Sequence, residues 1–154
     1  MLPFEKILCP TDFSRPSESG LAAAVELATH FRAALHLVHV VPALPATKDD
    51  PNYTFRVPEY EAALHAEARE RLDAMASQIG RAGLVVDHAI GHGHAGREIV
   101  RLAEEWGADL IVIATHGEGG WRHALFGSVA ERVVRAAPCP VVTVRPPAPA
   151  THAG

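Results

Sequence analysis

The chain has 154 residues, 48% of them hydrophobic, and a formal net charge of −4 at pH 7. These values are typical of one globular domain, and they give no reason to expect a nucleic acid or an acidic membrane surface as a partner. The two cysteines, Cys9 and Cys139, form no C-x-x-C pair and indicate a reducing compartment. Because no signal-peptide core and no membrane-length apolar run is present, we expect a cytoplasmic protein.

The start of the chain predicts two strands joined by a helix. The run "KILCP" at 6–10 is short, apolar and closed by a proline, which is typical of a buried strand. A helix is expected from Ser14 onward, because Ser14 or Arg15 can cap it, Pro16 suits its first turn and its apolar residues share one face. The second strand is expected at 34–41, "ALHLVHVV", which is rich in Val and Leu.

A proline-rich segment interrupts this alternation. Residues 42–58 contain four prolines and mixed polarity, so we expect a long loop there. Two roles stay open for it, an inert insertion or a flap over a ligand. A long helix is expected at about 59–82, because it carries an apolar stripe and ends near Gly80 and Gly83.

The second half of the chain again alternates strands with helices. The expected strands are 84–91, 109–115 and 140–145, and the expected helices are 95–107 and about 128–137. Five strands that alternate with helices predict a doubly wound, Rossmann-like α/β fold with a parallel sheet in the order 3-2-1-4-5 and helices on both faces. We expect one domain over 1–146 and a disordered tail at 147–154.

The loop after the fourth strand has the composition of an anion site. Gly117 and the two glycines that follow it can take positive φ and bring backbone N–H groups close to an anion. Gly127 and Ser128 then begin a helix, whose N–H groups and dipole favour negative charge. In the predicted sheet this loop faces Asp12, which can accept hydrogen bonds from a ribose. Glycine spacing alone is equally typical of a simple turn.

Four stretches of the sequence together match the pattern of a known family: "KILCPTDFS", "LHLVHVV", "GHAGREIVRLAEEWGADLIVIATHGEGG" and "FGSVAERVVRAAPCPVVTVR". Through them the chain resembles the universal stress protein family over 4–145. The nucleotide-binding members of that family have Gly, two residues, Gly, nine residues, and Gly followed by Ser or Thr. Here Gly117 and Gly127-Ser128 match, Ala114 replaces the first glycine, and Glu118 stands where family members often have a basic residue.

The resemblance implies that ATP, or a related adenine nucleotide, binds in the crevice with Mg²⁺ or Mn²⁺ carried by its phosphates. Asp12 would contact the ribose and Val40 the adenine. The implied binding set is completed by Pro10, Thr11, Ala114, His116, Gly117, Gly120, Gly127, Ser128 and Val129. The resemblance also implies a homodimer that pairs the fifth strands through Val141, Val142, Thr143 and Val144.

Three function classes stay open. The first is a nucleotide-binding regulator or sensor of the stress response. The second is a dimeric interaction module that has lost nucleotide binding, which Ala114 and Glu118 favour. The third is a nucleotide hydrolase or transferase, but neither a catalytic base nor an arginine finger is identifiable, so any ATP hydrolysis would be slow and no catalytic residue is assigned.

The ten histidines are weaker evidence for function. His88, His92 and His94 lie close together in the sequence, and two more flank the glycine loop, but no Cys or carboxylate completes a familiar metal spacing. We therefore expect no structural metal site. His39, inside the second strand, is expected to be packed or hydrogen-bonded.

Overall fold

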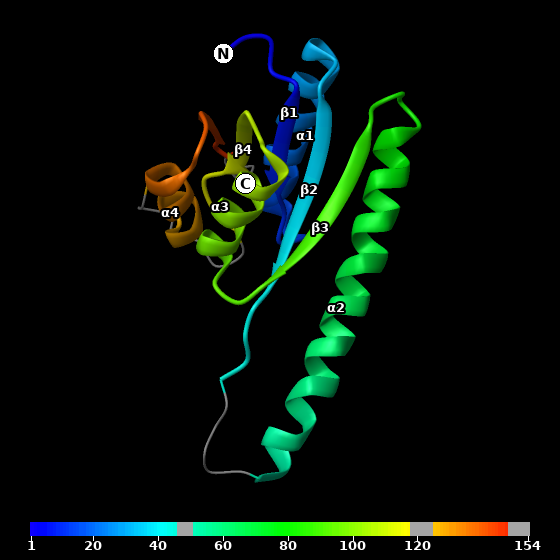
Figure 1. Ribbon diagram of the computed structural model, residues 1–154, viewed down its shortest axis with the longest axis vertical. Helices are drawn as coiled ribbons and strands as arrows, with labels where there is room; N and C mark the ends of the chain where they lie inside the picture. The colour runs from blue at the N-terminus through cyan, green and yellow to red at the C-terminus, as the bar shows by residue number, and fades with distance from the viewer. Residues whose placement is uncertain (46–50, 118–124, 148–154) are drawn as a thin grey trace, which may run out of the picture.

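The computed structural model describes residues 1–45, 51–117 and 125–147. Within these ranges, five strands form one parallel sheet in the predicted order β3-β2-β1-β4-β5 (Figure 1). The strands are β1 (Lys6–Pro10), β2 (Ala34–Val41), β3 (Val86–His92), β4 (Leu110–Ala114) and β5 (Val141–Val144). The helices are α1 (Arg15–Phe31), α2 (Pro51–Gly80), α3 (Ala95–Trp106) and α4 (Ser128–Ala136). This is the doubly wound α/β arrangement.

Helices cover both faces of the sheet and enclose two hydrophobic cores. One core lies against α1 and α2, and the other lies against α3 and α4. Side chains of β4 alternate between them: Leu110 and Val112 pack in the first core, and Ile111 and Ile113 pack in the second. Because β4 is buried on both faces, it reads in the sequence as an uninterrupted apolar run.

Helix α1 begins, as predicted, at a capping serine. The Ser14 Oγ accepts a hydrogen bond from the Ser17 N–H at 3.4 Å, and the Ser17 hydroxyl donates to the Ser14 carbonyl at 2.7 Å. Further along α1, Gly20 faces β4, where a Cβ would lie 2.9 Å from the backbone N of Ala114. Glycine at this position therefore lets α1 approach the carboxyl end of β4 closely.

The predicted loop at 42–58 is wrong over its second half, because α2 begins at Pro51. A proline is tolerated in the first turn of a helix, where its missing N–H has no intrahelical partner to lose. Pro58 lies inside α2 and removes one backbone hydrogen bond from a helix of 30 residues. Residues 42–45 are irregular as predicted, and the rest of the flap hypothesis concerns 46–50, outside the described residues.

The remaining boundaries differ from the prediction by one or two residues. The third strand begins at Val86 rather than at 84, and the fourth ends at Ala114 rather than at 115. The single domain over 1–146 stays a prediction, and the tail at 148–154 lies outside the described residues. In the part of the chain that the structure describes, no helix has the length and apolarity needed to cross a bilayer.

Candidate functional site

A cavity of about 540 Å³ opens at the carboxyl ends of β1, β2 and β4. This is the edge at which the predicted sheet order reverses, and ligands of doubly wound folds bind there. The sequence-predicted residues that line the cavity are Pro10, Thr11, Asp12, Val40, Ala114, His116, Gly117, Gly127, Ser128 and Val129. Gly120, Glu118, Trp121 and His123 lie outside the described residues.

Sequence reasoning missed the apolar part of the cavity wall. The missed lining residues include Val38, Ala95, Ile99, Ile113, Phe126 and Ala130, together with Ser17, His39 and Thr115. Four of them, namely Val38, Ile99, Ile113 and Ala130, are at most 5% exposed and belong to the core against α3 and α4. Their sequence pattern is that of ordinary core residues, so it carries no separate signal of a cavity.

Asp12 lies in a tight turn between β1 and α1. Its Oδ1 accepts a hydrogen bond from the Ser14 N–H at 3.0 Å and another from the Ser14 hydroxyl. The intervening Phe13 has a φ of 63°, in the left-handed region that is uncommon for residues other than glycine. This turn directs the other oxygen, Oδ2, toward Gly117, where it would overlap any Cβ.

The expected reason for glycine at 117 is a positive φ, but the structure shows a different one, namely lack of space for a side chain. Its backbone is not in the positive-φ region, unlike that of Gly83, Gly93 and Gly107. Instead, the Asp12 carboxylate occupies the volume that a side chain would need. The loops after β1 and β4 thus touch at the cavity, as the sheet order predicts, and glycine is required by close approach.

Two helices begin at the cavity. Gly127 precedes α4, and Ser128 and Val129 in its first turn line the cavity wall. Ala95 is the first residue of α3 and lines the cavity as well. Neither helix has a side-chain cap at its N-terminus. Both positive helix ends therefore meet in one place, which favours an anionic ligand.

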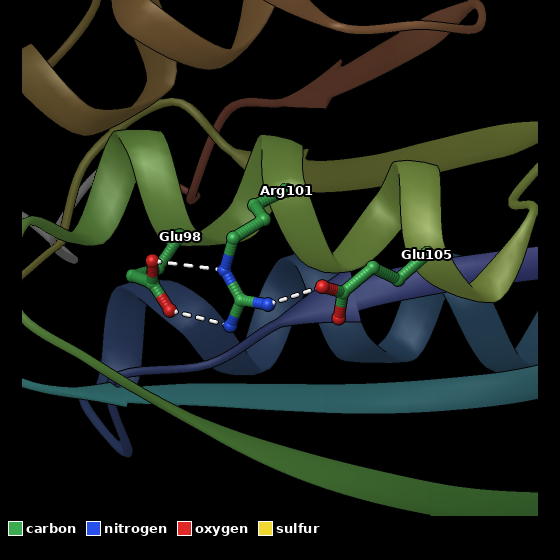
Figure 2. A network of polar contacts seen from close by, with 3 residues as sticks. All are labelled: Glu98, Arg101 and Glu105. Carbon is green, nitrogen blue, oxygen red and sulfur yellow. Dashed lines mark hydrogen bonds and ion pairs between the residues drawn. The ribbon is translucent and has the colours of Figure 1, made fainter.

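Arg101, in the middle of α3, is held by two acidic residues of the same helix (Figure 2). Arg101 donates to Glu98 at 3.0 and 2.8 Å and to Glu105 at 2.5 Å. The bonds from Arg101 are the main cause that lowers the pKa of the Glu98 carboxyl. Among the described residues, no Arg or Lys lines the cavity, and the two helix ends are the groups there that favour negative charge.

Three of the described histidines each lie beside one carboxylate. His36 contacts Asp87, His88 lies 2.6 Å from Asp73, and His92 lies 3.3 Å from Glu61. In the described ranges, no group of three His, Cys, Asp or Glu residues is placed to hold a metal ion.

The cysteines are not activated nucleophiles. Cys9 is fully buried in the core against α1 and α2, and burial raises the pKa of its thiol to about 12. Burial also raises the pKa of Cys139. Both thiols are free, and they stay protonated at neutral pH.

Comparisons with known proteins identify the family of this chain. The model of the universal stress protein family matches residues 3–145. The universal stress protein MJ0531 of Methanocaldococcus jannaschii is 33% identical over 144 residues, which cover 94% of this chain and 84% of that protein. The resemblance stated from the sequence motifs is confirmed.

Solved structures show the same fold. The universal stress protein UspA from Lactobacillus plantarum has a TM-score of 0.81 and 24% identity, covering 92% of this chain and 98% of its own. The universal stress protein from Archaeoglobus fulgidus in complex with dAMP has a TM-score of 0.61 and 25% identity, covering 93% and 98%. The family match over nearly the whole chain, together with the fold, shows that this chain belongs to the universal stress protein family.

Proposed function

We propose that this protein binds an adenine nucleotide, ATP or a relative, in the cavity and acts as a regulator or sensor of the stress response. One observation carries the proposal: Asp12, Gly117 and the start of α4 come together around one cavity of about 540 Å³. A solved relative in complex with dAMP supports an adenine nucleotide as the ligand class. The two free thiols support a reducing, cytoplasmic setting.

The walls of the cavity suggest how the nucleotide would lie. Its phosphates would meet the N-terminus of α4, where Ser128 offers a hydroxyl to them or to an accompanying Mg²⁺ or Mn²⁺. Its ribose would lie at Asp12. Its base would lie beside Val40 and against the aliphatic side chains of Ile99 and Ile113, which offer dispersion contacts and exclude water.

The position of Ala114 supports the nucleotide function over the interaction module. Ala114 is the last residue of β4 and pairs with Val144 of β5, and its methyl group faces Gly20 of α1. The apolar cavity wall lies on the opposite face of the sheet, formed by residues such as Ile99 and Ala130. Although Ala114 belongs to the cavity wall, its methyl group points toward Gly20, so we expect it to leave the nucleotide volume open.

Calorimetry with ATP and Mg²⁺ tests the proposal. We expect saturable binding by the wild-type protein and its loss in Gly127→Val, whose side chain would enter the phosphate volume. A Cβ at Gly127 would make an ordinary 3.4 Å contact with the Thr115 carbonyl, so the fold tolerates a side chain there. Gly80→Val is the matched control, because Gly80 lies at the end of α2 with no neighbour within 4 Å. Unchanged binding by Gly127→Val would place the nucleotide elsewhere.

We also propose a homodimer formed through β5. This strand lies at the edge of the sheet, and Val142 is 39% exposed. An apolar edge strand presents unpaired N–H and C=O groups that a second copy can satisfy.

A further inference from the structure

His39 belongs to the wall of the proposed nucleotide cavity, and its ring contacts the turn that carries Asp12. Its ring stacks on Phe13, with ring centroids 4.4 Å apart. It also lines a second cavity of about 140 Å³, whose walls include Leu64, Ala68 and Arg71 of α2. The imidazole thus lies between α2 and the loop after β1.

A hydrogen bond from His39 holds the peptide group that precedes Asp12. The Nδ1 atom lies 2.8 Å from the Thr11 carbonyl oxygen, and a carbonyl can only accept, so Nδ1 carries the hydrogen and donates it. The Thr11 N–H donates to the Val38 carbonyl at 2.8 Å. Both backbone polar groups of Thr11 are therefore fastened to β2.

Phe13, two residues after Thr11, needs this support because its backbone is strained. Phe13 has a φ of 63°, which side chains larger than glycine rarely adopt. Three contacts hold it there: its N–H donates to the Thr11 Oγ1 at 3.0 Å, its ring stacks on His39, and the Arg71 guanidinium lies 5.1 Å from the ring centroid. The strained turn is what directs the Asp12 carboxylate toward Gly117.

We propose that His39 is a positioning residue for Asp12, and that it sets recognition of the ribose through the Asp12 carboxylate, although His39 itself belongs to the cavity wall. The inference rests on the proposed function, in which Asp12 accepts hydrogen bonds from the ribose hydroxyls. Without the Nδ1 donor the Thr11 carbonyl loses its partner, Phe13 relaxes from the left-handed region, and the carboxylate moves. Ligands that lack ribose hydroxyls do not depend on this carboxylate, so His39 discriminates between ligands.

Calorimetry with ATP and 2′,3′-dideoxy-ATP provides the test. Wild type is expected to prefer ATP. His39→Leu should weaken ATP binding by about tenfold and leave dideoxy-ATP binding unchanged, since only a hydrogen bond to the ribose is lost. His39→Asn has nearly the same shape as the leucine variant but retains a donor at the Nδ1 position, and it should restore the preference. His88→Leu, which removes a histidine paired with Asp73 outside the cavity, is the control.

Amide hydrogen exchange in the ligand-free protein separates this inference from the proposed function. The N–H groups of Phe13 and Ser14 should exchange about tenfold faster in His39→Leu than in wild type, and at the wild-type rate in His39→Asn and His88→Leu. If wild type binds neither nucleotide, nucleotide binding is wrong and the exchange rates alone decide the role of His39. Unchanged exchange, or an unchanged ATP preference in His39→Leu, overturns the inference. Should the leucine variant not fold, His39→Phe keeps the ring, lacks the donor and carries the same expectations.

Discussion

Because the Asp12 carboxylate lies against Gly117, adding one methyl group at position 117 tests the role of that carboxylate in nucleotide binding. In Gly117→Ala the new Cβ overlaps Oδ2 of Asp12, and the carboxylate is the flexible partner, so it rotates away while the backbone keeps its course. We expect ATP affinity to fall by about tenfold, the loss of one hydrogen bond to a charged group. Calorimetry measures the affinity, and thermal unfolding should show little change.

Gly80→Ala is the control for this substitution, because it adds the same methyl group where no atom lies within 4 Å. Equal ATP binding by Gly117→Ala and wild type would show that the Asp12 carboxylate does not contact the nucleotide.

Ala114 and Gly20 form a second close contact, on the other face of the sheet. In Ala114→Gly we expect ATP affinity to change by less than tenfold, because the methyl group that is removed faces α1 and not the nucleotide volume. The free energy of unfolding should fall by about 0.5–1 kcal/mol, the cost of glycine inside a strand.

Urea unfolding and calorimetry of the same Ala114→Gly preparation check both values. An ATP affinity that rises strongly from an undetectable wild-type level would instead favour the interaction module that has lost nucleotide binding.

At the scale of elements, the strands were easier to predict than the long helix. The bounds of β1 and β2 match the prediction, because buried parallel strands are continuous apolar runs with clear ends. The four prolines and mixed polarity of 42–58 predict a loop, but Pro51 is the first residue of α2. Composition cannot distinguish a proline that begins a helix from one that prevents it.

The edge strand β5 carries the dimer prediction. The carbonyls of Pro140 and Val144 accept hydrogen bonds from β4, so the backbone groups of Val141 and Thr143 point away from the sheet, toward a partner strand. Thr143→Pro removes an outward donor, and we expect it to weaken the dimer by about tenfold or more. Sedimentation of wild type and variant across a concentration series measures this.

Val142→Pro is the comparison for Thr143→Pro. The N–H of Val142 points inward to β4, so this variant should lower the stability of the protomer as well as weaken the dimer. A wild-type protein that sediments as a monomer at micromolar concentration would contradict the dimer.

At the scale of the whole molecule, the sequence predicted the polar half of the candidate site but not the apolar half. Glycines, Asp12 and a helix start are rare enough in combination to signal an anion site, whereas Ile99 and Ile113 look like any other core residue. Phe13, with its left-handed backbone, contacts His39 and Arg71, which lie on other elements. No local pattern contains that information.

Because the cavity is shared by β1, β2, β4, α3 and α4, nucleotide binding should stabilise the whole fold. At an ATP concentration one hundred times the Kd, we expect about 2.7 kcal/mol of added stability, provided that the unfolded chain does not bind. For a chain of this size that raises Tm by roughly 5–10 °C. Calorimetric scans with and without ATP and Mg²⁺ measure it, and an unchanged Tm at saturating ATP would contradict binding to the native state.

The pairing of β1 with β4 also has a kinetic consequence. Asp12 lies in the turn directly after β1, whereas Gly117 and α4 come much later in the chain, so the cavity is complete only after β4 has inserted beside β1. An intermediate made of β1, α1, β2, α2 and β3 has only one wall of the cavity. A nucleotide that bridges both walls would therefore leave the folding rate unchanged and slow unfolding, lengthening the lifetime of the native protein as ATP accumulates.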